Sequence, residues 1–274
     1  MAKRSKGRWG GTITGIKKNH ASGKSILKYD SKKTYKIIVH KGYRIKSVIV
    51  NGINKGKIKK VTLKGNGKTQ TIKVTFLKGK LRIMLDAGHA GYYNRGIIKS
   101  YWESKMTWKL TNYLKKDLEA YGIECGMTKK SQRHDPSVYG RGRKARGYSL
   151  FISIHSNWAP SASADYPLAI VSSKYKKRLY KKAQPLGRKL ASVIKTTMKT
   201  KQNYMVWVKR QRGGKDWYGV IRGAASVNVP GIILEHSFHS NKKKCKWLLK
   251  NKNLKKMAAA EAKTIAKHYG YISK

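Results

Sequence analysis

The first part of the chain contains short segments in which apolar and polar residues alternate or nearly alternate. This period of two predicts β-strands, at residues 34–40, 44–50, 58–63 and 71–76. Asn51-Gly52 directly follows the second segment and is a strong signal for a tight hairpin turn. Short strands separated by Gly and Asn turns predict a small sandwich or meander over residues 1–80.

Beyond residue 80 the pattern changes to apolar runs that alternate with segments of helical periodicity, and Lys78-Gly79-Lys80 is the predicted linker. The apolar runs predict strands at 81–85, 123–127, 150–154, 169–171 and 231–234. Helical spacing predicts helices at 104–121, 175–199 and 253–268, and a basic helix face is expected over 141–146. This order predicts an α/β domain over 81–274, with a mixed, mostly parallel sheet flanked by helices on both faces and preceded by the small all-β module.

The charge of the chain is extreme, with 64 Lys+Arg against 11 Asp+Glu and a formal net charge of +53. A field of this strength attracts polyanions in a salt-dependent way. Nucleic acid, an anionic membrane surface and a cell wall that carries phosphate polymers all fit this charge. No helix-turn-helix, zinc-knuckle or RNA-recognition signature is present in the sequence, so any binding to nucleic acid is expected to be non-specific.

Three further features limit where the protein works. No run approaches the ~18 apolar residues of a membrane span. Cys125 and Cys245 are far apart and are expected to be free thiols. The N-terminal segment Met1–Arg8 is basic and has no apolar stretch behind it, so we expect no signal peptide.

Candidate chemistry is concentrated at the ends of predicted strands. His89, His155 and Glu235 each follow an apolar run, and such positions gather at one edge of an α/β sheet. Glu103 opens a predicted helix that can face the same edge. Two imidazoles and one carboxylate, from His89, Glu103 and His155, form the ligand set of one catalytic Zn²⁺ with an open position. Glu235 is then the candidate general base, while His239 is expected to support the site or face the substrate rather than bind the metal.

Four motifs in the second domain also match a known family in order. They are Asp86-Ala87-Gly88-His89-Ala90-Gly91, Trp102-Glu103-Ser104, the strand at 151–157, and Ile233-Leu234-Glu235-His236-Ser237-Phe238-His239-Ser240-Asn241. Segment 81–274 thereby resembles the zinc-dependent N-acetylmuramoyl-L-alanine amidases of type 3, with Ala90 in place of a family glycine. The form of the last motif is most similar to amidases of clostridial bacteria and their phages.

The resemblance implies hydrolysis of the amide between the lactyl group of N-acetylmuramic acid and the L-alanine of the peptidoglycan stem peptide. It implies zinc on His89, Glu103 and His155, and a catalytic Glu235. With no signal peptide expected, the chain is interpreted as a phage or prophage lysin that acts at the bacterial cell wall. Such a lysin is cytoplasmic before release or is delivered by a phage-type particle. Residues 1–80 are then expected to bind anionic wall polymers through their basic surface.

Two alternatives remain open at the level of sequence. One is a bacterial autolysin of the same chemistry, and the other is a polyanion-binding protein without activity. Trp158, Trp207 and Trp217 are candidates to line a sugar or peptide groove, but packing in the core is the preferred interpretation.

Overall fold

The computed structural model describes residues 10–15, 25–40, 43–78 and 81–272. The basic segment Met1–Arg8 and residues 79–80 of the predicted linker lie outside the described residues. The chain divides into two compact units, a β unit of residues 1–80 with 269–274 and an α/β unit of residues 81–268. Within the described residues, no helix has both the length and the apolar character needed to cross a membrane.

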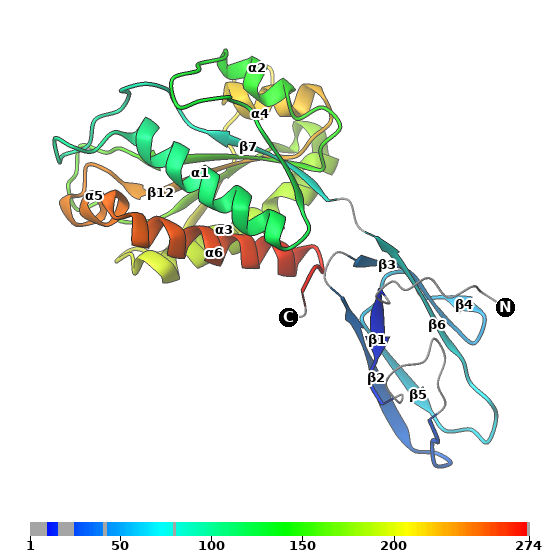
Figure 1. Ribbon diagram of the computed structural model, residues 1–274. Coiled ribbons are helices and arrows are strands. Elements are labelled where there is room, and N and C mark those ends of the chain that lie inside the picture. Colours follow the sequence, from blue (N-terminus) through cyan, green and yellow to red (C-terminus); the bar gives the residue numbers. More distant parts are fainter. Residues whose placement is uncertain (1–9, 16–24, 41–42, 79–80, 273–274) are drawn as a thin grey trace. The chain divides into compact units, whose positions relative to one another are not determined.

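The β unit consists of two three-stranded antiparallel sheets (Figure 1). One contains β1 (Gly11–Ile13), β2 (Lys32–Val39) and β5 (Lys60–Lys64), and the other contains β4 (Ile53–Asn54), β3 (Tyr43–Val50) and β6 (Ile72–Lys78). Their inward side chains share one core, of Tyr35, Ile37, Val61 and Leu63 from the first sheet and Ile45, Val48 and Val50 from the second. The predicted turn is confirmed, because Asn51 and Gly52 both have positive φ and connect β3 to β4.

A six-stranded sheet forms the centre of the α/β unit, in the order β11-β10-β12-β9-β7-β8. Its strands are β7 (Arg82–Ala87), β8 (Glu124–Met127), β9 (Leu150–Asn157), β10 (Leu168–Val171), β11 (Met205–Trp207) and β12 (Gly231–Phe238). All neighbouring pairs are parallel except β10 and β12, which run antiparallel. The predicted mixed, mostly parallel sheet is therefore confirmed.

Helices cover both faces of this sheet (Figure 1). One layer contains α1 (Glu103–Ala120), α3 (Lys177–Met198), which follows a short 3-10 turn, and α6 (Asn251–His268), with α5 (Lys242–Leu249) packed beside α6. The other layer contains α2 (Val138–Arg143) and α4 (Gly219–Ser226). The three long predicted helices are confirmed to within a few residues, because their regularly spaced apolar side chains face the sheet and are buried.

The expectation of a basic helix face over residues 141–146 is wrong. Helix α2 ends at Arg143, and Arg141 is 4% exposed. The guanidinium of Arg141 lies 3.7 Å from the carboxylate of Asp86, which is itself fully buried. Burial of this cation is accounted for by a buried anion, which residue type and helical spacing alone do not reveal.

The alternation of side chains along β9 and β12 decides which face of the sheet each site residue points to. Phe151 on β9 and Ile233 on β12 both pack into the cluster around α4. Since successive side chains alternate between faces, His155 and Glu235 point to that same side. His236 points to the opposite side, toward α6.

Candidate active site

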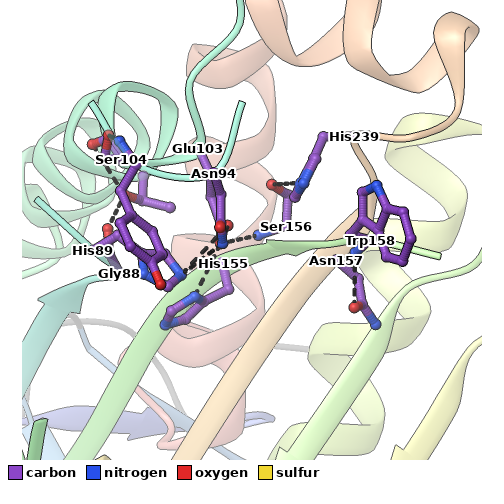
Figure 2. Close-up of polar contacts among 12 residues, drawn as sticks. Gly88, His89, Asn94, Glu103, Ser104, His155, Ser156, Asn157, Trp158 and His239 are labelled. Atoms are coloured by element: carbon purple, nitrogen blue, oxygen red, sulfur yellow. Dashed lines mark hydrogen bonds and ion pairs between the residues drawn. The ribbon is translucent and has the colours of Figure 1, made fainter. Parts of the chain in front are cut away.

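His89, Glu103 and His155 come together from the end of β7, the first residue of α1 and the end of β9 (Figure 2). One ligand atom from each lies within 4.8 Å of the others. His155 Nδ1 is 3.0 Å from Glu103 Oε1, and His89 Nε2 is 3.4 Å from Glu103 Oε2. Donor atoms around a tetrahedral zinc ion, each at ~2.0–2.1 Å from the metal, are about 3.3 Å apart. Two of the donor spacings are close to this value, and the chemistry of the donor set fits zinc.

A glycine allows this close approach. Gly88 follows β7, and its N–H donates to the carbonyl of Ile154 at 3.0 Å. A Cβ at position 88 would lie 2.3 Å from the His155 ring. Any larger residue there would displace the imidazole, so the glycine of the Asp-x-Gly-His motif is required by packing.

Asn94 was not predicted from the sequence, yet it lies between the ligand candidates (Figure 2). Its Nδ2 donates to Glu103 Oε2 at 2.7 Å and contacts His89 Nε2 at 3.2 Å. Because the amide nitrogen can only donate, His89 Nε2 is the acceptor in this contact and carries no hydrogen, as a metal-binding nitrogen must not. Asn94 has a φ of +51, a conformation that Asn adopts more readily than most residues. An Asn among turn-forming residues was the signal that the sequence offered.

The electrostatics at Glu103 and His89 favour the protonation states that bind a metal, whereas the pKa of His155 is raised, because the hydrogen bond and charge of Glu103 outweigh burial. Burial would raise the pKa of Glu103, but the hydrogen bond and charge of His155, together with His89, hold that pKa at about 2. Burial lowers the pKa of His89 to about 4. At neutral pH the carboxylate is therefore ionised and this imidazole is neutral, as metal ligands must be.

His155 is oriented from behind by a buried hydrogen-bond chain. Its Nε2 lies 3.1 Å from Ser153 Oγ, and Ser153 Oγ donates to Asp86 Oδ2 at 2.6 Å. Thr128 Oγ1 donates to the other oxygen of Asp86. This chain leaves Nδ1 of His155 facing Glu103, which is the arrangement expected behind a metal-binding histidine. Both Asp86 and Ser153 belong to the sequence motifs, but no role was predicted for them.

His239 takes part in a second buried network, behind Glu103 (Figure 2). Its Nδ1 is 3.0 Å from Ser156 Oγ, and that hydroxyl is 2.7 Å from the Tyr101 hydroxyl. The backbone N–H of Ser156 donates to Glu103 Oε1 at 3.0 Å. Since His239 is 2% exposed, it supports the site and does not face substrate.

Glu235 lies beside His155, because the two residues are direct partners in the parallel pairing of β12 and β9. Glu235 is partly exposed near the C-terminal end of β12, but its Oε2 atom is buried and has no hydrogen-bond partner among the described residues. Burial raises the pKa of Glu235 to about 7; His155 opposes this shift, and the negative charge of Glu103 adds to it. A carboxylate with an unused acceptor atom and a pKa near neutrality can accept a proton and release it.

The preferred interpretation of three tryptophans as core residues is wrong. Trp158, Trp207 and Trp217 are 60%, 42% and 51% exposed. Trp158 directly follows β9 (Figure 2). The Trp158 and Trp207 rings are exposed enough to stack on a bound molecule, whereas Lys209 Nζ lies 4.7 Å from the centroid of the Trp217 ring.

Comparisons with solved structures show where this fold occurs. The chain matches Cwp6 from Clostridium difficile with a TM-score of 0.57 and 22% identity, over 69% of this chain and 29% of that chain. It matches the catalytic domain of CwlV, an N-acetylmuramoyl-L-alanine amidase from Bacillus (Paenibacillus) polymyxa var. colistinus, with a TM-score of 0.56 and 16% identity, over 68% and 97% of the two chains. An N-acetylmuramoyl-L-alanine amidase from Clostridium difficile 630 gives a TM-score of 0.58 and 16% identity, over 69% and 96%. These similarities establish the fold.

The sequence itself assigns the family. No curated protein sequence matches the chain. A family model described as N-acetylmuramoyl-L-alanine amidase matches residues 83–267, which include all four candidate site residues and all of the strands and long helices of the α/β unit except the first residue of β7 and the last of α6. Since that match extends over most of the chain, the protein belongs to the Amidase_3 family of N-acetylmuramoyl-L-alanine amidases, enzymes that act on peptidoglycan.

Proposed function

We propose that the chain is a zinc-dependent enzyme that hydrolyses the amide between N-acetylmuramic acid and L-alanine in peptidoglycan. His89, Glu103 and His155 hold the single zinc ion, and Glu235 is the catalytic residue. The observation that carries the proposal is the convergence of the three donors beside a carboxylate whose buried Oε2 has no partner in the described structure.

The reaction needs a nucleophile, a polarised carbonyl and a proton carrier. Zinc supplies Lewis acidity, which lowers the pKa of water and polarises a carbonyl. Glu235 takes a proton from the attacking water as the new C–O bond forms at the lactyl carbonyl carbon. It returns that proton to the leaving nitrogen as the C–N bond breaks, so the products are a lactyl carboxyl group and a free L-alanine amine.

Digestion of purified peptidoglycan by the zinc-loaded protein tests this proposal. Mass spectrometry of the soluble fraction should find stem peptides with a new L-alanine amino terminus, and a chelator should abolish them. Cleavage at another bond would retain a metal hydrolase but reject the assignment of the bond. Undiminished cleavage after verified removal of all metal would reject the zinc mechanism.

The biological role is proposed from the Glu235–Asn241 motif, whose form resembles amidases of clostridial bacteria and their phages. We infer a phage-type lysin that acts at the cell wall, and a bacterial autolysin of the same chemistry is the alternative. Transcription that rises on prophage induction would support the lysin. Steady transcription during growth without induction would support the autolysin.

A second proposed function concerns the β unit, which we infer binds an anionic wall polymer that carries phosphate. The outward face of β2 and β5 consists of residues opposite to the core side chains, and all are exposed. On this face Lys32 is paired directly with Lys64, and Lys36 with Lys60. Like charges opposite each other destabilise an antiparallel pair, so folding alone does not favour this arrangement.

Little on this face offsets its charge. Asp30 is the one acidic residue within residues 1–80, and it contacts Lys64 at 2.5 Å. Thr34 and Thr62 lie between the two lysine pairs and share a hydrogen bond of 2.8 Å. Paired lysines along one face of a sheet match a linear polymer with regularly spaced phosphates, and attachment to a peptidoglycan amidase favours a wall polymer over nucleic acid.

A matched pair of variants tests this lysine face. The first changes its four lysines to Gln, at Lys32, Lys36, Lys60 and Lys64. The control removes the same charge from exposed positions on α1, α3 and α6, at Lys116, Lys181, Lys182 and Lys256. Only the first variant should bind walls more weakly, and its log–log slope of affinity against salt should fall by roughly one unit for each phosphate that it no longer neutralises. Equal losses in both variants, or stronger binding to DNA than to walls, would contradict the proposal.

A further inference from the structure

The strand that carries Glu235 is irregular immediately after it. Glu235 pairs with His155, but the next pair is Phe238 with Asn157, so β12 has one more residue than β9 in between. This is a β-bulge, a feature that often re-aims side chains next to active sites. Ser237, within the bulge, has a φ of +58, which is a strained conformation for Ser.

Both residues of the bulge are anchored by buried polar contacts. Ser237 Oγ donates to Asp165 Oδ1 at 3.0 Å. His236 is fully buried on the other face of the sheet, with its Nδ1 2.9 Å from the backbone carbonyl of His155. Its Nε2 is 2.7 Å from Oε1 of Glu261, a fully buried residue of α6. His236 therefore connects β12 to both β9 and α6.

The two contacts define the state of the ring. A carbonyl only accepts, so Nδ1 of His236 carries a hydrogen and donates it to His155. The carboxylate of Glu261 then fixes the ring from the other side. Burial lowers the pKa of His236, but the charge and hydrogen bond of Glu261 outweigh burial and raise this pKa above its ordinary value. His236 and Glu261 are a hydrogen-bonded polar pair inside the core, a combination that is costly to bury and adds directional contacts.

We propose that His236 and Glu261 are positioning residues that hold the bulge of β12 against His155 and thereby keep the Glu235 carboxylate in its reactive position. The side chain of His236 donates a hydrogen bond to the backbone carbonyl of His155. This carbonyl lies where the bulge interrupts the regular pairing of β12 with β9. The inference rests on the proposed roles of Glu235 and His155. It adds a pair that contacts neither zinc nor substrate and acts through the backbone of both strands.

A double substitution separates positioning from stability. Removing one partner would leave the other polar side chain buried without its hydrogen bond, whereas replacing both by apolar residues of similar size is often tolerated. In His236→Leu/Glu261→Met we expect a folded, zinc-binding protein with kcat reduced at least about tenfold and KM within about twofold of the parent. The structural control is Leu254→Ala, which weakens the packing of α6 without touching the pair. This control should lower the thermal midpoint but leave kcat close to that of the parent.

The outcomes are decisive in either direction. A kcat of the double variant within twofold of the parent, or a loss no larger than that of Leu254→Ala, would overturn the inference. If the double variant fails to fold, His236→Asn and His236→Ala replace it, because Asn can still donate to the His155 carbonyl. Higher kcat for Asn than for Ala at equal thermal stability supports positioning, and equal kcat rejects it. Full activity of Glu235→Gln in the same assay would instead reject the proposed function.

Discussion

Replacing Glu235 by Gln tests the assignment of the catalytic residue most directly. Gln has the same shape as Glu but cannot take a proton from water. Oε2 of Glu235 has no hydrogen-bond partner among the described residues, so the substitution breaks no contact of that atom. It also removes a carboxylate whose ionised form is disfavoured by burial. The variant should therefore fold, with a thermal midpoint equal to or slightly above that of the parent.

The expected effect on rate follows from the role. Loss of a general acid–base group typically costs ~10²–10⁴-fold in rate. At 1.36 kcal/mol for each factor of ten, this is about 2.7–5.4 kcal/mol of transition-state stabilisation. Zinc content should stay at one ion per chain, because Glu235 lies outside the donor set of His89, Glu103 and His155. A merely structural Glu235 would not produce a large loss of kcat at constant stability and metal content.

The assay is the release of L-alanine amino termini from purified peptidoglycan, with zinc measured in the same preparations by elemental analysis. Glu119→Gln is a matched control, since this exposed carboxylate on α1 pairs only with Lys115 in the described structure. The control should retain parental activity. If Glu235→Gln kept more than about a tenth of the parental kcat, the role of general base would be wrong. If it lost its zinc, Glu235 would be a ligand instead.

Two further predictions concern the metal. Ser153→Ala removes the hydrogen-bonded link between His155 and Asp86 and should weaken zinc binding about 10–100-fold. Competition with a chelator measures this affinity, and an unchanged affinity would show that the link does not orient His155. Zinc at about 100 times its dissociation constant should stabilise the folded parent by ~2.7 kcal/mol and raise its thermal midpoint, whereas His155→Ala should show no such rise.

Much of the fold could be predicted because burial leaves a periodic trace in the sequence. Helix α1 has apolar residues at each turn, and every residue of β9 before His155 is apolar except Ser153. Helix α4 was missed, since Gly, Ala and Ser dominate its eight residues and give a weak pattern. Glycines allow it to approach α2 closely: a Cβ on Gly142 would lie 2.1 Å from the Val220 carbonyl. Such packing is not visible as hydrophobic periodicity.

The ligand candidates could be found because strand ends converge in this fold, but their supports could not. Asn94 lies in a loop, where no periodic pattern connects it to His89 or Glu103. Asp86 lies two residues before Gly88, and Ser153 lies two residues before His155. Only the pairing of β7 with β9 shows that Asp86 and Ser153 are neighbours. The three tryptophans were misjudged because a large aromatic residue is usually buried, and nothing in the local sequence shows that these face solvent.

The distribution of carboxylates connects the charge of the chain to its chemistry. Only 11 acidic residues accompany 64 basic ones, and five of them are buried: Asp86, Glu103, Asp165, Asp216 and Glu261. Asp86 orients His155, Glu103 completes the donor set, Glu261 holds His236, and Asp165 holds Ser237 in the bulge. In this basic chain, four of the five buried acids each hold a polar neighbour at or beside the candidate site. We therefore expect acid-to-amide substitutions at Glu235 and at the buried acids Asp86, Glu103, Asp165 and Glu261 to reduce activity, and substitutions at the exposed acids to leave it nearly unchanged.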